Sequence, residues 1–259
     1  MPFHSRHDPF CFYACVLPSF LESAVPTYVE NLEPLFREDP ETLAWLHDTW
    51  LPEEAEHGRL LRNYVERVWP EFQWERAYVE FCVLYLPRCE TGKLRPSAGL
   101  EALARCVTET EATMIYRCIG RYATDPELAM LMKRLSSDEA RHYSRFRRLH
   151  ERHQATEKLS FLRRARALIA RSELIREEDL ALAFLPLNGA WSSPPPFATW
   201  SYRQFISAAG RIMRVHFPFE EAKRMLFHPL RTQSPGTQLA MAFMAWWVSR
   251  QFLRRGGVG

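Results

Sequence analysis

The sequence lacks the features that mark several common classes of binding protein. Its six cysteines form no C-x-x-C pair and no second pair at zinc-site spacing, so a thiolate metal site is not indicated. It contains no glycine fingerprint of a dinucleotide-binding fold. Its 34 basic and 31 acidic residues leave a net charge of +3 with no long run of one sign. We therefore expect no nucleic-acid partner.

Long hydrophobic runs are also missing. The longest apolar stretch near the end, Leu239 to Val248, is far shorter than the roughly 20 residues that a bilayer span needs, and it is typical of a buried helix. The first ten residues, MPFHSRHDPF, carry His, Asp and Pro where a signal peptide has a basic start and an apolar run. The sequence predicts a cytoplasmic protein without stable membrane insertion.

What is present is an ordinary globular composition with helical periodicity. Hydrophobic residues make up 47% and charged residues 25% of the chain, which is enough for a sizeable core. Apolar residues recur at helical spacing, and no segment shows comparable strand-like alternation. After an irregular lead-in at 1–16 and around a connector at 190–196, we expect helices over residues 18–35, 40–67, 71–86, 97–122, 126–153, 200–215, 219–227 and 236–254. One or two further helices are expected between residue 157 and the connector, with Arg164 to Arg171 facing outward.

Two short motifs carry the chemistry. Glu54 and His57 form one Glu-x-x-His pair, and Glu139 and His142 form another. Positions i and i+3 lie on one face of a helix about one turn apart, so each pair can place a carboxylate oxygen and an imidazole nitrogen on the same metal ion. Both pairs fall on the apolar stripes of their predicted helices, which favours a buried site over an incidental solvated face.

Two further glutamates complete a repeating order of a lone Glu followed by a pair. Glu22 lies on the apolar stripe of the first helix, where a carboxylate is expensive unless it is paired or bound to metal. On 97–122 both Glu109 and Glu111 are candidates; the apolar stripe favours Glu111, and Glu109 is rotated from it by about 160°. The set matches the ligands of carboxylate-bridged di-iron bundles. The predicted metal ligands are Glu22, Glu54, His57, Glu111, Glu139 and His142.

Three stretches resemble one known family. Residues 50–64 read W-L-P-E-E-A-E-H-G-R-L-L-R-N-Y and are similar to W-T-A-E-E-N-R-H-G-D-L-L-x-x-Y of the soluble acyl-(acyl carrier protein) desaturases. Residues 22–28, E-S-A-V-P-T-Y, resemble the E-E-A-L-P-T-Y of that family, and residues 138–142, D-E-A-R-H, resemble its D-E-K-R-H. The resemblance covers roughly residues 15–155 and three motifs in the same order.

The resemblance implies a fold and a set of roles. The fold is an all-α, ferritin-like four-helix bundle over residues 1–156, with additional C-terminal helices over 157–259 packed on it. Glu22 and the two Glu-x-x-His pairs take the family's ligand positions, and Asp138 takes that of a carboxylate beside them. The fourth motif, Q-E-R-A-T, corresponds to T-E-T-E-A-T at 108–113. If Glu111 is the ligand, the family's Thr, three residues past its Glu, corresponds to Met114, and Thr113 is one place away. The resemblance thus gives Thr113 and Asp138 as the candidate catalytic residues.

The implied activity is oxygen-dependent desaturation. Two iron ions, with manganese as another metal suited to these ligands, would activate O₂ and introduce a double bond into an acyl chain on an acyl carrier protein. Electrons would come from an external ferredoxin-like donor, and a homodimer is expected. Arg59, Arg62 and Arg67 could receive an acidic carrier. Alternatives are a di-iron hydroxylase or N-oxygenase, a ferroxidase or iron-binding protein without organic substrate, and a helical interaction module that binds no metal.

Overall fold

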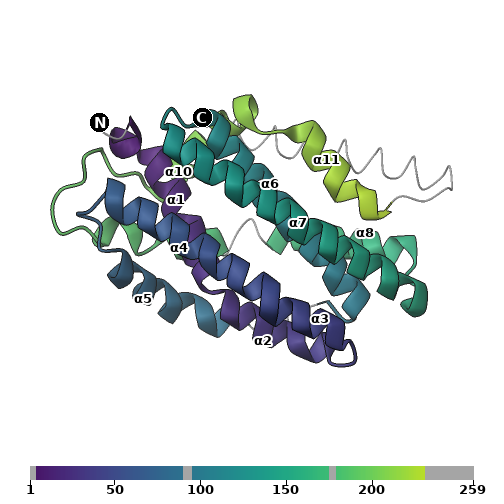
Figure 1. The fold of residues 1–259 in the computed structure, drawn as a ribbon. Helices are drawn as coiled ribbons and strands as arrows, with labels where there is room; N and C mark the ends of the chain where they lie inside the picture. The colour runs from purple at the N-terminus through teal and green to yellow at the C-terminus, as the bar shows by residue number, and fades with distance from the viewer. Residues whose placement is uncertain (1–3, 90–94, 175–178, 231–259) are drawn as a thin grey trace. The chain divides into compact units, whose positions relative to one another are not determined.

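A computed structural model describes residues 4–89, 95–174 and 179–230 of the chain. Within these ranges the chain forms helices and turns, and its single β-bridge joins Phe72 to Trp191 without forming a strand (Figure 1). The predicted all-α, ferritin-like helical fold is confirmed. The helix predicted at 236–254 lies outside the described residues.

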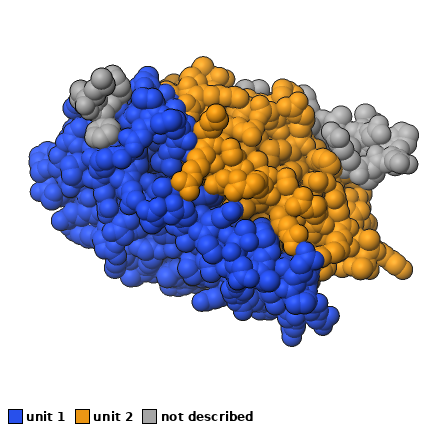
Figure 2. All heavy atoms as spheres, viewed as in Figure 1, with its two compact units in different colours: residues 1–94, 123–131, 175–205 blue, residues 95–122, 132–174, 206–259 orange. Residues whose placement is uncertain are grey.

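The chain divides into two compact units. Unit 1 comprises residues 1–94, 123–131 and 175–205, and unit 2 comprises residues 95–122, 132–174 and 206–259 (Figure 2). Both units combine segments from before and after residue 156, and the boundaries expected from the sequence stay a prediction.

Unit 1 begins with a helix that the sequence did not predict. After the short turn η1 (His4–His7), helix α1 runs from Pro9 to Ser23 and includes the second half of the segment expected to be an irregular lead-in. The Asp8 side chain caps it by accepting a hydrogen bond from the Phe10 N–H at 2.8 Å, and Pro9 occupies the first turn, where no N–H is needed. The expectation of a lead-in was wrong because these local start signals outweigh the aromatic-rich, irregular composition.

The helix predicted at 18–35 is two helices. Helix α1 ends at Ser23, Ala24 forms the junction, and α2 runs from Val25 to Phe36. Pro26 lies in the first turn of α2, so its missing N–H removes no internal hydrogen bond there. The break between the two helices therefore falls directly before Pro26, where a proline is tolerated.

No single helix among the described residues has both the length and the apolar composition to cross a membrane. The pair α1 and α2, bent by 44°, would pass on length and composition alone.

The segment predicted as one helix over 40–67 contains a change of helical type. Helix α3 (Pro40–Trp45) leads into a π-helical turn, η2 (Leu46–Trp50), and then into α4 (Leu51–Val68). The Leu51 N–H bonds the Leu46 carbonyl five residues back. Pro52 follows directly, and the wider turn accommodates its ring and missing N–H. The π-turn thus sets the rotation of α4 just before its Glu-x-x-His pair.

The core of unit 1 is aromatic. Helix α5 (Trp74–Tyr85) packs on α1 through Phe20, which stacks on Phe81 with ring centroids 5.4 Å apart. The short turn η3 (Leu86–Arg88) follows α5, and α9 (Leu180–Phe184) with η6 (Leu187–Gly189) leads to the predicted connector at 190–196, which is non-helical. The ring centroids of Phe12 in α1 and Trp191 in this connector lie 4.9 Å apart.

Unit 2 contains the longest helices. They are α6 (Ala98–Tyr122), most of α7 (Pro126–Glu157), α8 (Phe161–Leu174), most of α10 (Tyr202–His216), α11 (Phe219–Phe227) and the turn η7 (His228–Leu230). Helices α6 and α7 run in opposite directions, because the start of α6 contacts the end of α7. Glu157 caps α6 by accepting hydrogen bonds from the Gly99 N–H at 3.0 Å and the Ser97 hydroxyl at 2.6 Å.

Arg164 and Arg171 of α8 are buried, which corrects the expectation that Arg164 to Arg171 face outward, whereas Arg166 is exposed. Arg171 donates to the fully buried Glu101 of α6 at 2.7 Å, and Arg105 also pairs with Glu101. Arg164 donates to the Pro229 carbonyl at 2.9 Å. Burial lowers the pKa of Arg171 to about 10. The expectation failed because the carboxylate and carbonyl that satisfy these cations lie far away in sequence.

A buried polar network joins the start of α7 to η1 and α4 within unit 1. Asp125 accepts hydrogen bonds from the Tyr64 hydroxyl at 2.6 Å and the Ser5 hydroxyl at 2.9 Å through the same oxygen, Oδ2. Its other oxygen caps α7 by accepting from the Glu127 N–H at 3.0 Å. Burial acts to raise the pKa of Asp125, but the hydrogen bonds from Tyr64 and Ser5 outweigh it and lower the pKa.

The substitution Asp125→Asn should therefore destabilise the protein in a pH-dependent way. A carboxyl group with a lowered folded-state pKa stabilises the fold fully above its unfolded pKa of about 3.9 and loses that contribution as the pH falls through the folded-state value. We expect a loss of about 2 kcal/mol at pH 7, the typical worth of a hydrogen bond to a charged group, and a smaller difference below about pH 4. Urea unfolding across pH measures this, and the exposed Asp48→Asn change is the control. A loss of stability below about pH 4 as large as that at pH 7 would contradict the role given to the ionised Asp125.

Candidate metal centre

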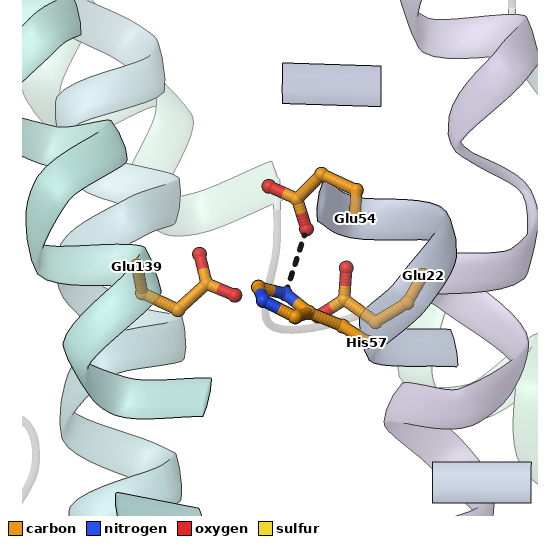
Figure 3. Close-up of side chains that lie close together, drawn as sticks. All are labelled: Glu22, Glu54, His57 and Glu139. Atoms are coloured by element: carbon orange, nitrogen blue, oxygen red, sulfur yellow. Dashed lines mark ion pairs between the residues drawn. The ribbon is translucent and has the colours of Figure 1, made fainter. Parts of the chain in front are cut away.

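The first cluster of ligand-type side chains belongs to unit 1. Glu54 and His57 lie on α4 and are buried, and Glu22 lies near the end of α1 and is half-buried. His57 Nδ1 is 3.4 Å from Glu54 Oε2, the contact drawn as a dashed line in Figure 3. One ligand atom from each of the three residues lies within 4.8 Å of the others. These three predicted ligands are therefore brought together.

A glycine makes this cluster possible. A Cβ at position 58 would lie 2.6 Å from the Ser23 hydroxyl oxygen and 2.9 Å from the Ser23 main-chain nitrogen. Both distances are shorter than van der Waals contact, and the second involves backbone that cannot rotate away. Gly58 thus lets α4 approach α1 closely. Because His57 precedes Gly58 and Glu22 precedes Ser23 in the sequence, this close approach brings the side chains of His57 and Glu22 together.

The second cluster belongs to unit 2. Glu139 and His142 lie on α7, and Glu109 lies on α6; all three are buried. His142 Nδ1 is 3.6 Å from Glu139 Oε2 and 3.8 Å from Glu109 Oε2. One ligand atom from each lies within 4.8 Å of the others. Figure 3 also labels Glu139. Unit 2 therefore repeats the composition of the first cluster, with one lone glutamate and one Glu-x-x-His pair.

The glutamate of α6 that clusters with Glu139 and His142 is Glu109, and not Glu111, which the apolar stripe had favoured. Glu109 is buried beside His142, whereas Glu111 is only half-buried and is not among the clustered ligand atoms. Helix α6 is buried on nearly all sides, so apolar residues on it do not mark one inward face. A better signal was the row of charged residues Glu101, Arg105 and Glu109, whose spacing of four places them on one face.

The two candidate catalytic residues occupy different environments. The Thr113 hydroxyl is fully buried and donates to the Glu109 carbonyl at 2.6 Å, one turn back on α6. Asp138 lies beside Glu139 on α7 and accepts a hydrogen bond from Arg141 at 2.5 Å. Thr113 is thus tied to the main chain of the residue that clusters with His142, and Asp138 is held by an arginine on its own helix.

The donor chemistry of each cluster fits a divalent metal ion. Each offers two carboxylates and one imidazole, and two carboxylates within 4.8 Å of an imidazole repel each other unless a cation or protons offset their charge. Oxygen and nitrogen donors without thiolate suit iron or manganese. Glu22, Glu54 and His57 would hold one ion, and Glu109, Glu139 and His142 another.

A comparison with protein families gives one match. Residues 101–185 match the Rubrerythrin family, and the matched segment contains Glu109, Glu139 and His142. That family is part of the ferritin-like di-iron carboxylate superfamily, so the match supports the superfamily that the motifs had suggested. It covers less than half of the chain and does not show a relationship to the acyl carrier protein desaturases in particular. No curated protein matches the chain.

We expect Gly58→Ala to weaken metal binding at the unit 1 cluster. The added methyl must push the main chain of Ser23 away, which separates Glu22 from His57 and should cost about 1–3 kcal/mol of stability, as overpacking usually does. Titration with Fe²⁺ and thermal unfolding measure the two effects. Gly189→Ala is the matched control, because a Cβ there meets no atom within 4 Å. Identical behaviour of the two variants would contradict the close-approach role of Gly58.

The pair Glu109→Gln and Glu111→Gln tests directly which glutamate of α6 binds metal. Both changes remove one negative charge from the same helix, two residues apart, but only Glu109 lies beside His142. Glu109→Gln should lower metal affinity by at least about tenfold, the scale seen even for residues that support ligands indirectly, and Glu111→Gln should leave it unchanged. Isothermal titration with Fe²⁺ under anaerobic conditions distinguishes them. The reverse order would restore Glu111 as the ligand.

Proposed function

We propose that the two clusters are halves of one di-iron centre and that the protein uses it, with O₂, to oxidise an organic substrate. The observation that carries the proposal is the repetition of the ligand set. Each unit separately gathers a lone glutamate with a Glu-x-x-His pair, with ligand atoms within 4.8 Å of one another. The same division of ligands over four helices is typical of di-iron carboxylate bundles. The Rubrerythrin match over 101–185 supports the same class.

Charge balance favours two ions over one. The four carboxylates of Glu22, Glu54, Glu109 and Glu139 carry a charge of about −4 when ionised, which two Fe²⁺ ions neutralise. A single ion would leave two negative charges in a largely buried site, at a large desolvation cost. Bound iron in its reduced form would supply O₂ activation. The side chains named here would hold and orient the ions, and the apolar surroundings would limit the access of water.

For the substrate, the proposal is an acyl chain held by an acyl carrier protein. It rests on the motif resemblance around Glu22, Glu54 and Glu139. Arg59, Arg62 and Arg67 would be its docking residues, and each already pairs with a carboxylate, in turn Glu56, Glu66 and Glu127. A carrier protein must compete with these exposed ion pairs, which are individually weak. Electrons would come from an external ferredoxin-like protein, and the active form would be a homodimer.

Thr113 would have to change its hydrogen bond to move a proton. Its hydroxyl donates to the Glu109 carbonyl, and rotation about χ1 would redirect it. The variant Thr113→Val keeps the size of the side chain and removes the hydroxyl. Iron binding should then persist, and the yield of oxidised product per O₂ consumed should fall.

Metal analysis tests first whether the protein holds a di-iron centre. Protein loaded anaerobically with Fe²⁺ and desalted should retain about two iron ions per chain, as a di-iron bundle does. His57→Ala and His142→Ala, one in each cluster, should each lower that value. Retention of one ion, unaffected by His142→Ala, would contradict a shared centre.

Product analysis then tests the substrate. The iron-loaded protein, a chemical reductant and O₂ are incubated with an acyl chain on an acyl carrier protein, and the product is examined by mass spectrometry. Loss of two hydrogens indicates desaturation, and gain of one oxygen indicates a hydroxylase or N-oxygenase. Iron oxidation with an unchanged acyl chain, repeated with free fatty acid and amine substrates, would leave a ferroxidase and overturn the oxidase proposal.

A further inference from the structure

Tyr64 is a buried phenol hydrogen-bonded to a buried carboxylate. Its hydroxyl donates to Asp125 Oδ2 at 2.6 Å, and Ser5, whose hydroxyl contacts the same phenol, donates to this oxygen at 2.9 Å. The exposed fractions of Tyr64 and Asp125 are 2% and 5%. Burial raises the pKa of Tyr64, so the phenol keeps its proton in the resting protein. The pair therefore holds a proton donor and an ionised acceptor in a nearly water-free setting.

This pair is close to the unit 1 cluster along a single helix. Tyr64 and His57 both lie on α4, seven residues apart. Seven residues are about two turns, so the two side chains share a face of α4 and are separated by about 10 Å along its axis. All the residues concerned belong to unit 1, and Leu61, which lies between the two side chains on the same face of α4, is fully buried.

We propose that Tyr64 and Asp125 form a redox-active pair that supplies one electron to the metal centre when O₂ or a peroxide reacts there without an organic substrate in place. This inference rests on the proposed function. In the step, Tyr64 loses one electron to the oxidised centre, and its phenolic proton passes from Oη to Oδ2 of Asp125. The products are a neutral phenoxyl radical and a protonated carboxyl group. One electron from the external reductant, with return of the proton, restores both groups.

The surroundings require the proton to leave with the electron. The Arg67 guanidinium carbon lies 5.7 Å from the centroid of the Tyr64 ring. A positively charged ring beside this cation, in a buried position, would be strongly disfavoured. Transfer of the proton to Asp125 keeps the ring neutral and places no new charge near Arg67. The Tyr78 hydroxyl differs, because it donates to the Ser23 carbonyl at 2.8 Å. A carbonyl does not take up a proton at neutral pH, so Tyr78 could not pass on its proton in this way.

The role fits an oxidase that must survive turnover without substrate. Without substrate, the oxidant formed from O₂ or peroxide would otherwise attack the metal ligands or thiols such as Cys15, which is buried in the same unit. Trp69 lies against Tyr64 with ring centroids 6.1 Å apart and offers a second electron source beyond it. The network that caps α7 would thus also direct the oxidant to a residue that can be re-reduced.

The test is radical detection in the iron-loaded full chain. Protein carrying Fe²⁺ is mixed with hydrogen peroxide in the absence of substrate, frozen at intervals and examined by electron paramagnetic resonance. We expect a tyrosyl signal whose hyperfine pattern changes when the protein contains ring-deuterated tyrosine. Tyr64→Phe should abolish the signal. Asp125→Asn, which keeps the phenol, should slow its formation and remove the solvent deuterium effect seen in the wild type.

Controls separate this role from a structural one. Tyr78→Phe and Cys15→Ser should retain the signal, and iron content and thermal unfolding establish that each variant is folded and loaded. Normal iron content without a radical in the wild type overturns this inference and leaves the proposed function standing. A signal that persists in Tyr64→Phe also overturns it. Failure to bind iron overturns the proposed function, and the inference with it.

Discussion

The constraint on which the rest of the structure depends is the placement of carboxylates and imidazoles inside helices that pack closely. Glu54, His57, Glu109, Glu139 and His142 are all buried, and burial of ionised carboxylates is unfavourable unless a counter-charge is present. Within each unit the side chains come from two helices whose main chains must therefore be held in fixed register. A pair of divalent ions is the counter-charge that best matches their number and type.

Register in each unit is set by backbone devices. In unit 1 these are the Asp8 cap, the break at Ala24 before Pro26, the π-turn before Pro52 and the missing side chain of Gly58. In unit 2 the Glu157 carboxylate closes the first turn of α6, and a Cβ at Gly99 would lie 2.9 Å from that carboxylate. The break at Ala24, the π-turn and Gly58 each lie within about one turn of Glu22, Glu54 or His57. In unit 1 the ligand-type side chains are therefore positioned by the main chain more than by mutual attraction.

The network of Ser5, Tyr64 and Asp125 stabilises the fold and, if the proposed electron transfer occurs, would serve chemistry as well. Its hydrogen bonds fix the start of α7 to α4 and keep a carboxylate ionised in the core. The same bonds align a phenol with a proton acceptor on the helix that carries His57. A side chain placed for capping would thus also be placed for proton-coupled electron transfer, without any additional buried charge.

The sequence by itself determined the helical class, most helix positions and both Glu-x-x-His pairs, because periodicity, caps and i, i+3 spacing are local properties. It also indicated Glu22 from its place on an apolar stripe. Only the tertiary structure decided between Glu109 and Glu111, since α6 is buried on nearly all sides and its composition marks no single face. The same holds for the buried arginines of α8 and for the pairing of Tyr64 with Asp125. Their partners lie up to 70 residues away along the chain, where no local pattern can specify them.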